Sequence, residues 1–416
     1  MAGNFTPHNR VLILGPTGID KKDACKAVAE YANTHFGHNI RFYDFEKDFI
    51  FPLVPDFQSF LNDRITVAYQ TWERAWEDFK KKLNGDIVLF SLHATLVSGL
   101  FGPRSAINIR RICEEFKPTL IITLIDDVYN MWGRTEKRAE GRARLRPTIE
   151  QILMARRTEA LLGDLIMITR QPDHVKHIIC SVNHPLEVIV NQIIFDADVT
   201  YLSFPITESL KMIEESGDST LKGYIDEAHQ IALKEMRNDR TRCFISPLSI
   251  DELPFLDAMN ESNKIEREVD GQKVMKFRFD ADASRWRLTD LWGPDTKLIA
   301  KPFEFEEFDW EQVAQAAGLV WTDIGWRDRR LVLQSRNLAV VCPVPPGRNE
   351  ITGGVKDEIE TAIPNGVYCY IWQKKEWDLQ DIVGRTFKRP TSMGLGAISQ
   401  MSEIADSLET LIQMKP

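Results

Sequence analysis

The stretch VLILGPTGIDKKDACKAVAE, residues 11–30, joins an apolar run to a helical pattern through a turn that contains two glycines. Four consecutive aliphatic residues at 11–14 are typical of a strand buried in a parallel sheet, and the alanine-rich segment after the turn predicts a helix over 20–35. A strand, a tight turn and a helix in this order indicate an α/β fold, in which the helix N-terminus faces the carboxyl end of the strand.

The same alternation of apolar runs and helical patterns extends along most of the chain. Predicted strands fall at 10–15, 39–45, 86–90, 119–125, 176–182, 199–206, 242–248, 338–344 and 366–372. Predicted helices fall at 20–35, 56–83, 105–116, 128–163 and 219–237, after NHPLEV, over VKDEIETA and near 394–413. We therefore expect two Rossmann-like domains with largely parallel sheets, covering 1–197 and 198–416.

The alternation stops between residues 257 and 305. Within this segment, EVDGQKVMKFRF (268–279) has the pattern of a β-hairpin that turns at Asp270 and Gly271. We expect 257–305 to be an insertion or lid in the second domain.

Composition limits the classes of function. The 416 residues are 43% apolar and 27% charged, which is typical of a soluble globular protein, and no apolar stretch has the length of a membrane span. Because the N-terminus lacks the apolar core of a signal peptide, we expect a cytoplasmic protein. The six scattered cysteines predict free thiols in the core. A net charge of −9 argues against direct binding to nucleic acid.

Three motifs of the first half occur in the order found in nucleotide kinases. These are GPTGIDKK (15–22), SLHATL (91–96) after a predicted strand, and a run of arginines between 134 and 157. Together they resemble the archaeal-type adenylate kinases and related P-loop nucleotide kinases. The resemblance implies binding of ATP or GTP with Mg²⁺ through backbone amides, lysines and lid arginines. The implied nucleotide-binding residues are Gly15, Gly18, Lys21, Lys22, Arg134, Arg142 and Arg144.

The loop departs from that pattern at two positions. Asp20 introduces a negative charge where a glycine is usual, and Lys22 replaces the hydroxyl residue that binds magnesium. Two interpretations remain open: the loop holds a nucleotide without turning it over, or it is a tight turn in which Asp20 caps the following helix. The arginine run is likewise either a phosphate-clamping lid or a solvated basic helix face.

Three motifs of the second half resemble the nucleoside 2-deoxyribosyltransferases and related nucleotide N-glycosidases. They are YLSFPI (201–206), RDRRLVLQS (327–335) and ITGGVKDEIETA (351–362). The resemblance implies that Glu358 attacks C1′ of the sugar and that Asp328 acts at the sugar or the base. A carboxylate suits this position because cleavage of an N-glycosidic bond builds positive charge at the anomeric carbon. The implied substrate-binding residues are Tyr201, Ser203, Phe204, Thr352, Gly353 and Gly354.

Structural alternatives exist for both carboxylates. Glu358 could be a first-turn helix residue favoured by the helix dipole, and Asp328 could form an ion pair with Arg327, Arg329 or Arg330. The scattered histidines lack partners at metal-ligand spacing, so no metal site is expected, and the glycosidic chemistry requires no cofactor.

The leading hypothesis is cleavage or exchange of the N-glycosidic bond of a nucleoside or nucleotide, with the first domain as a nucleotide-binding regulator. One alternative is an ATP-dependent nucleoside or nucleotide kinase. The other is a non-catalytic, nucleotide-sensing subunit of a stress or antiviral defence system. The resemblance is also compatible with a homo-oligomer.

Overall fold

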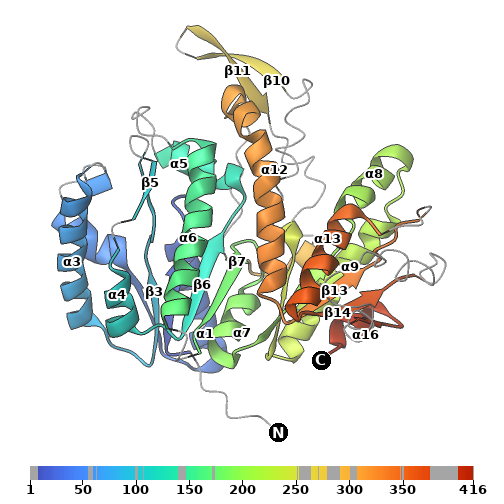
Figure 1. Cartoon of the computed structure of the whole chain (residues 1–416), viewed down its shortest axis with the longest axis horizontal. Coiled ribbons are helices and arrows are strands. Elements are labelled where there is room, and N and C mark those ends of the chain that lie inside the picture. Colours follow the sequence, from blue (N-terminus) through green and yellow to red (C-terminus); the bar gives the residue numbers. More distant parts are fainter. Residues whose placement is uncertain are drawn as a thin grey trace. The chain divides into compact units, whose positions relative to one another are not determined.

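The computed structural model describes residues 8–54, 60–61, 63–98, 102–105, 107–138, 147–170, 174–250, 252, 264–269, 271–278, 291–299, 307–346, 348, 351–374 and 402–415. The chain is an α/β protein that divides into two compact units (Figure 1). The first unit comprises Met1–Ile194, Ile250–Ser284 and Leu298–Ile324, and the second comprises Phe195–Ser249, Arg285–Lys297 and Gly325–Pro416. The first boundary lies close to position 197, whereas 250–284 and 298–324, which the sequence placed in the second domain, belong to the first unit.

The first unit is built on a parallel five-stranded sheet in the order β2-β3-β1-β6-β7. Its strands are β1 (Arg10–Leu14), β2 (Ile40–Asp44), β3 (Ile87–Ser91), β6 (Leu120–Ile125) and β7 (Lys176–Ser181). A separate antiparallel pair consists of β4 (Leu96–Ser98) and β5 (Gly102–Arg104). The first four residues of the opening stretch, Val11 to Leu14, are buried in the central strand, as their apolar character predicts.

Helices follow the strands of this sheet. They are α1 (Lys21–Phe36), α3 (Ile65–Lys82), α4 (Ile109–Arg111), α5 (Val128–Arg138), α6 (Ile149–Thr169) and α7 (Leu186–Phe195), with short helical turns at η1 (Glu46–Ile50), η2 (Phe51–Leu53) and η3 (Ile112–Phe116). The helical region predicted over 128–163 is confirmed at 128–138 and 149–163, where it forms two helices rather than one, because α6 starts anew at Ile149; residues 139–146 lie outside the described residues. A capping box between Thr148 and Gln151 marks this start.

The predicted hairpin is confirmed. β10 (Lys264–Val269) pairs antiparallel with β11 (Gln272–Arg278), and Gly271 has the positive φ of 76° that a tight hairpin turn requires. β12 (Glu307–Asp309) adds a third strand and leads into the long helix α12 (Trp310–Leu333). The division between the two units falls within α12, after Ile324.

The second unit contains another parallel five-stranded sheet, in the order β15-β14-β13-β8-β9. Its strands are β8 (Asp198–Ser203), β9 (Arg242–Ile245), β13 (Asn337–Val341), β14 (Tyr368–Trp372) and β15 (Ser402–Ile404). Its helices are α8 (Ile206–Ser216), α9 (Thr220–Asn238), α13 (Gly353–Ala362) and α16 (Leu408–Gln413), with short turns at η6 (Pro247–Ser249) and η9 (Ile363–Asn365). The predicted helix near 394–413 is wrong at 402–404, because these residues pair with β14 as an edge strand.

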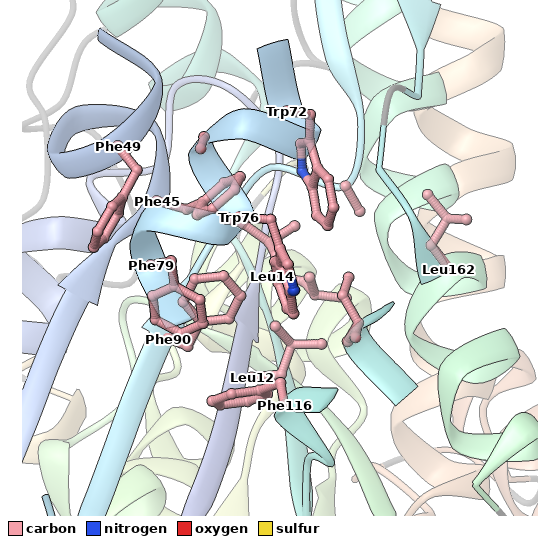
Figure 2. Packing of buried hydrophobic residues seen from close by; sticks show 14 of the residues in the cluster. Leu12, Leu14, Phe45, Phe49, Trp72, Trp76, Phe79, Phe90, Phe116 and Leu162 are labelled. Carbon is pink, nitrogen blue, oxygen red and sulfur yellow. The ribbon is translucent and has the colours of Figure 1, made fainter. Parts of the chain in front are cut away.

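An aromatic cluster forms part of the core of the first unit (Figure 2). Phe79 on α3 stacks on Phe90 of β3 with ring centroids 4.3 Å apart, and Trp72 stacks on Trp76 at 4.9 Å. The Phe79–Phe90 contact and a further contact of Trp76 with Phe90, at 5.8 Å, fix α3 on the sheet, since large aromatic side chains contribute much of the apolar area that a core buries.

All six cysteines are buried and free, as the sequence predicts. Among the residues that the structure describes, no helix combines the length and the apolar character needed to cross a membrane.

Close contact between α6 and the sheet depends on Gly163. A Cβ atom at this position would lie 2.5 Å from Nε2 of His177 on β7. The imidazole is held on both sides, because its Nδ1 lies 2.8 Å from Oδ1 of Asp164 and its Nε2 lies 2.8 Å from Oγ1 of Thr123. A ring fixed at both nitrogens cannot move aside without losing a buried hydrogen bond.

We expect Gly163→Ala to destabilise the first unit by about 1–3 kcal/mol, although alanine is the better helix former. Gly318→Ala is the matched control, since Gly318 is an exposed residue of α12 in the same unit with no atom within 4 Å of the added Cβ. The control should stabilise by about 0.5–1 kcal/mol. Urea denaturation followed by tryptophan fluorescence measures both changes, and equal stabilisation by the two substitutions would contradict the packing argument.

Candidate active site

The carboxyl ends of β8 and β13 meet where the strand order of the second sheet reverses. From β8 the chain goes to β9 on one side and then returns to β13 on the other. Open parallel sheets bind ligands in the crevice outside the strand ends at such a switch point. Topology therefore directs attention to the last residues of β8 and to the helix that follows β13.

That helix, α13, lies beside β13 and β14 (Figure 1). Its residues Val355, Ile359 and Ala362 are buried, and this spacing places them on one face of the helix, against the sheet. The loop before the helix is held by Gln373, whose side-chain amide accepts from the Val344 amide nitrogen at 3.1 Å and donates to the Val344 carbonyl at 2.9 Å. The rotation of α13 is thus set by packing, and Glu358 lies half-buried beside the buried face.

Both carboxylate oxygens of Glu358 accept hydrogen bonds from β8. The Tyr201 hydroxyl donates to Oε1 at 2.7 Å, and the Ser203 hydroxyl donates to Oε2. Tyr201 and Ser203 are two residues apart on one strand, so their side chains extend from the same face of the sheet. The structure therefore brings together three residues that the sequence selected from segments more than 150 positions apart.

Glu358 is the sixth residue of α13 rather than a first-turn residue. The structural alternative based on the helix dipole does not hold, because the dipole acts mainly within the first turn. Hydrogen bonds from Tyr201 and Ser203 hold the carboxylate instead.

Asp328 lies on α12 and forms an ion pair with its neighbour. Nε and Nη2 of Arg327 both lie 2.9 Å from Oδ1 of Asp328, and the Arg327 side chain is buried. This pair agrees with the structural alternative for Asp328, with Arg327 as a partner. The pair also belongs to the site, since the charges of both residues act on Glu358.

Burial raises the pKa of Glu358 to about 8, and the negative charge of Asp328 adds to this effect. The hydrogen bonds from Ser203 and Tyr201 and the charge of Arg327 act in the opposite direction. Burial and the nearby Glu358 carboxylate raise the pKa of the Tyr201 phenol, so Tyr201 remains a neutral hydrogen-bond donor. The result is a carboxyl group of unusual basicity, a property that is common at catalytic positions.

Other residues selected from the sequence surround this carboxylate less directly. Phe204 is buried, and its ring stacks on His229 with centroids 4.9 Å apart. Thr352 is the N-cap residue of α13, and its hydroxyl makes no hydrogen bond to any residue that the structure describes. Gly353 and Gly354 open the helix, are exposed, and have no atom within 4 Å of an added Cβ. Their backbone is thus open to an approaching group.

The residues selected for nucleotide binding lie in the first unit. Lys21 is buried and donates from Nζ to the Gly15 carbonyl at 2.5 Å, while Lys22 is partly exposed. Arg134 is also buried, and its Nη1 lies 2.5 Å from Oδ2 of Asp126 and 3.2 Å from the Gly18 carbonyl. Arg142 and Arg144 lie outside the described residues.

Asp20 is the N-cap residue of α1, and the loop is a tight turn, but the Asp20 side chain makes no capping hydrogen bond, so that part of the interpretation is wrong. Its carboxylate instead lies 3.8 Å from Nε of Arg134. This distance permits an ion pair between the loop and α5. The glycine that is usual at this position has no side chain that could form one.

Two buried charged residues were not predicted from the sequence to have a functional role. Arg327 was noted only as a partner of Asp328, and Glu159 on α6 was not selected at all. Glu159 accepts hydrogen bonds from the amide nitrogens of Gly15, Ala94 and Thr95. No local motif marks such a residue, because its donors come from two distant loops.

A comparison of the chain with known protein families and with curated proteins finds no match. Among the described residues, no group of three or more His, Cys, Asp or Glu side chains is arranged to hold a metal ion.

Proposed function

We propose that the second unit cleaves or exchanges the N-glycosidic bond of a nucleoside or nucleotide, with Glu358 as the nucleophile. The observation that carries the proposal is the pair of hydrogen bonds from Tyr201 and Ser203 to the two oxygens of Glu358. They hold a half-buried carboxylate of raised pKa outside the strand ends of a parallel sheet. Held carboxylates of this kind can capture an anomeric carbon as positive charge develops there.

The reaction has two balanced steps. In the first, one oxygen of ionised Glu358 forms a bond to C1′ while the C1′–N bond breaks, and its electron pair leaves with the base, which takes up a proton from solvent. In the second, water or another base forms a bond to C1′, the C1′–O bond to Glu358 breaks to release the carboxylate, and the proton of the water or of the incoming base returns to solvent. Hydrolysis and base exchange therefore share the first step and differ only in the acceptor.

Tyr201 and Ser203 have a positioning role in this scheme. The oxygen of Glu358 that does not attack keeps its hydroxyl donor, while the other donor can turn from the carboxylate toward the substrate. Hydroxyl groups rotate with little rearrangement of the chain, so they can exchange partners in a way that backbone amides cannot. This property distinguishes the site from a purely structural carboxylate.

The start of α13 offers a place for a negatively charged or hydroxylated part of the substrate. Thr352 has a hydroxyl that makes no hydrogen bond to the described residues, and Gly353 and Gly354 expose the first backbone of the helix. Free amides at a helix N-terminus favour anions, so a sugar phosphate or a sugar hydroxyl suits this place. We assign the sugar side of the substrate to this loop.

Glu358→Gln should reduce base release by on the order of 10³-fold or more, because an amide oxygen cannot form the glycosyl ester. The measurement is chromatography of free bases after incubation of the purified chain with a panel of nucleosides and nucleotides. The matched control is Glu360→Gln, an exposed carboxylate of the same helix, which should keep full activity. Equal activity of Glu358→Gln and the wild type would exclude the proposed nucleophile, provided that both proteins are folded.

The rate should also follow the ionisation of Glu358. Because the attacking form is the carboxylate and its pKa is about 8, kcat/KM should rise about tenfold per pH unit below that value and level off above it. Tyr201→Phe removes a hydrogen bond that lowers the pKa, so the profile should move to higher pH. Asp328→Asn removes a negative charge that raises the pKa, so the profile should move to lower pH.

The two substitutions should shift the pH profile in opposite directions. They therefore distinguish an electrostatic effect on Glu358 from a loss of folded protein. Loss of activity through misfolding would lower the whole profile without moving its midpoint. Shifts in the same direction for Tyr201→Phe and Asp328→Asn would contradict the assigned roles.

A further inference from the structure

The turn between β1 and α1 already holds an anionic side chain from its own chain. Oε2 of Glu159 accepts from the Gly15 amide nitrogen at 3.1 Å and from the Ala94 amide nitrogen at 3.3 Å. Its Oε1 accepts from the Thr95 amide nitrogen at 2.7 Å. The side chain of Glu159 is fully buried, so these three amides replace the hydrogen bonds that water would donate to an exposed carboxylate.

Lys21 completes the surroundings of this carboxylate. Its side chain is buried and is fixed by donation to the Gly15 carbonyl at 2.5 Å. Burial raises the pKa of Glu159, whereas the positive charge of Lys21 and the amide donors oppose that rise. Burial likewise lowers the pKa of Lys21, and Glu159 is the largest opposing influence. Each charge therefore makes the burial of the other less unfavourable.

The rest of the turn is closed on itself. The Lys21 amide nitrogen donates to the Ile19 carbonyl at 2.8 Å, and Ile19 donates to Pro16 at 3.4 Å. A Cβ atom on Gly18 would lie 2.6 Å from the Met131 carbonyl oxygen, so α5 lies directly against the turn. Two backbone amides that would face a phosphate in an open loop are thus used within the turn.

A bound nucleoside triphosphate with Mg²⁺ does not fit these residues. Asp20 presents a carboxylate at the turn, and Lys22 supplies no oxygen ligand for the metal ion. Such a ligand would use the Gly15 amide and the Lys21 ammonium. The Gly15 amide instead donates to Glu159, and the Lys21 ammonium donates to the Gly15 carbonyl. We propose that Glu159 is the resident anion of this turn, and that the first unit keeps an oxyanion site whose ligand is its own side chain.

The proposal differs from ordinary core packing in one measurable respect. Removal of the Glu159 carboxylate leaves three inward amides without their acceptor and removes the largest of the negative charges that act on Lys21, with Glu46 and Asp44 remaining, and a small carboxylate from solution can then replace it. Acetate has the same carbon and oxygen atoms that Glu159→Ala removes beyond Cβ. An apolar cavity on the same helix has no such preference for an anion.

The experiment compares thermal unfolding of three proteins in sodium acetate and in sodium chloride of equal ionic strength. Glu159→Ala should have a lowered Tm, and saturating acetate should raise it by about 2–4 °C more than chloride does. Ile166→Ala removes a buried apolar side chain of the same helix, and it should lose stability without any acetate-specific recovery. Lys21→Ala combined with Glu159→Ala should lose the acetate effect, because the countercharge is gone.

A second test compares the wild type with Lys21→Ala. Titration with ATP and Mg²⁺, and separately with pyrophosphate, should give no heat of binding and no rise in Tm that Lys21→Ala removes, whatever the second unit binds. Binding of either compound to the wild type, abolished by Lys21→Ala, would overturn the proposal. Equal recovery of Glu159→Ala and Ile166→Ala in acetate would overturn it as well. Neither outcome depends on glycosidic activity at Glu358.

Discussion

The chemistry proposed for this protein depends on one carboxylate held by two hydroxyl groups from alternate residues of a single strand. The alternation of side chains along β8 places Tyr201 and Ser203 on the same face, and the buried face of α13 sets the rotation that brings Glu358 to them. Neither feature is sufficient alone. A shift of the β8 pairing by one residue would turn both hydroxyls to the opposite face of the sheet.

The two units contain buried carboxylates in contrasting surroundings. Glu159 accepts from three backbone amides and has Lys21 as its countercharge, so its environment is made of groups that cannot reorient. Glu358 accepts from two hydroxyls among the described residues, with Asp328 as a nearby like charge. Fixed amides favour a permanent structural anion, whereas rotatable hydroxyls and a raised pKa favour a group that changes partners during a reaction.

Local patterns in the sequence were sufficient for most of the fold. The apolar run before the first turn, the hairpin at Gly271 and the buried thiols all appear where periodicity, turn chemistry and composition placed them. Local patterns failed at 402–404, where a segment of helical character forms an edge strand because β14 offers unpaired backbone groups. They also failed at Asp20, which is the N-cap residue of α1 but makes no capping hydrogen bond through its side chain; its carboxylate lies 3.8 Å from Nε of Arg134.

The sequence predicted those residues of the candidate site that lie in recognisable motifs. Tyr201, Ser203 and Glu358 were grouped by the resemblance to the nucleoside 2-deoxyribosyltransferases, and the position of Tyr201 and Ser203 at the carboxyl end of a parallel strand agrees with that grouping. Asp328 combines the two roles that were treated as alternatives, an ion pair with a neighbouring arginine and an effect on the site. Its ion pair with Arg327 fixes the position of its charge, and that charge adds to burial, which is the main cause of the raised pKa of Glu358. Structural and catalytic interpretations of a buried ion pair are therefore compatible, since the positioning of one charge controls the ionisation of its neighbour.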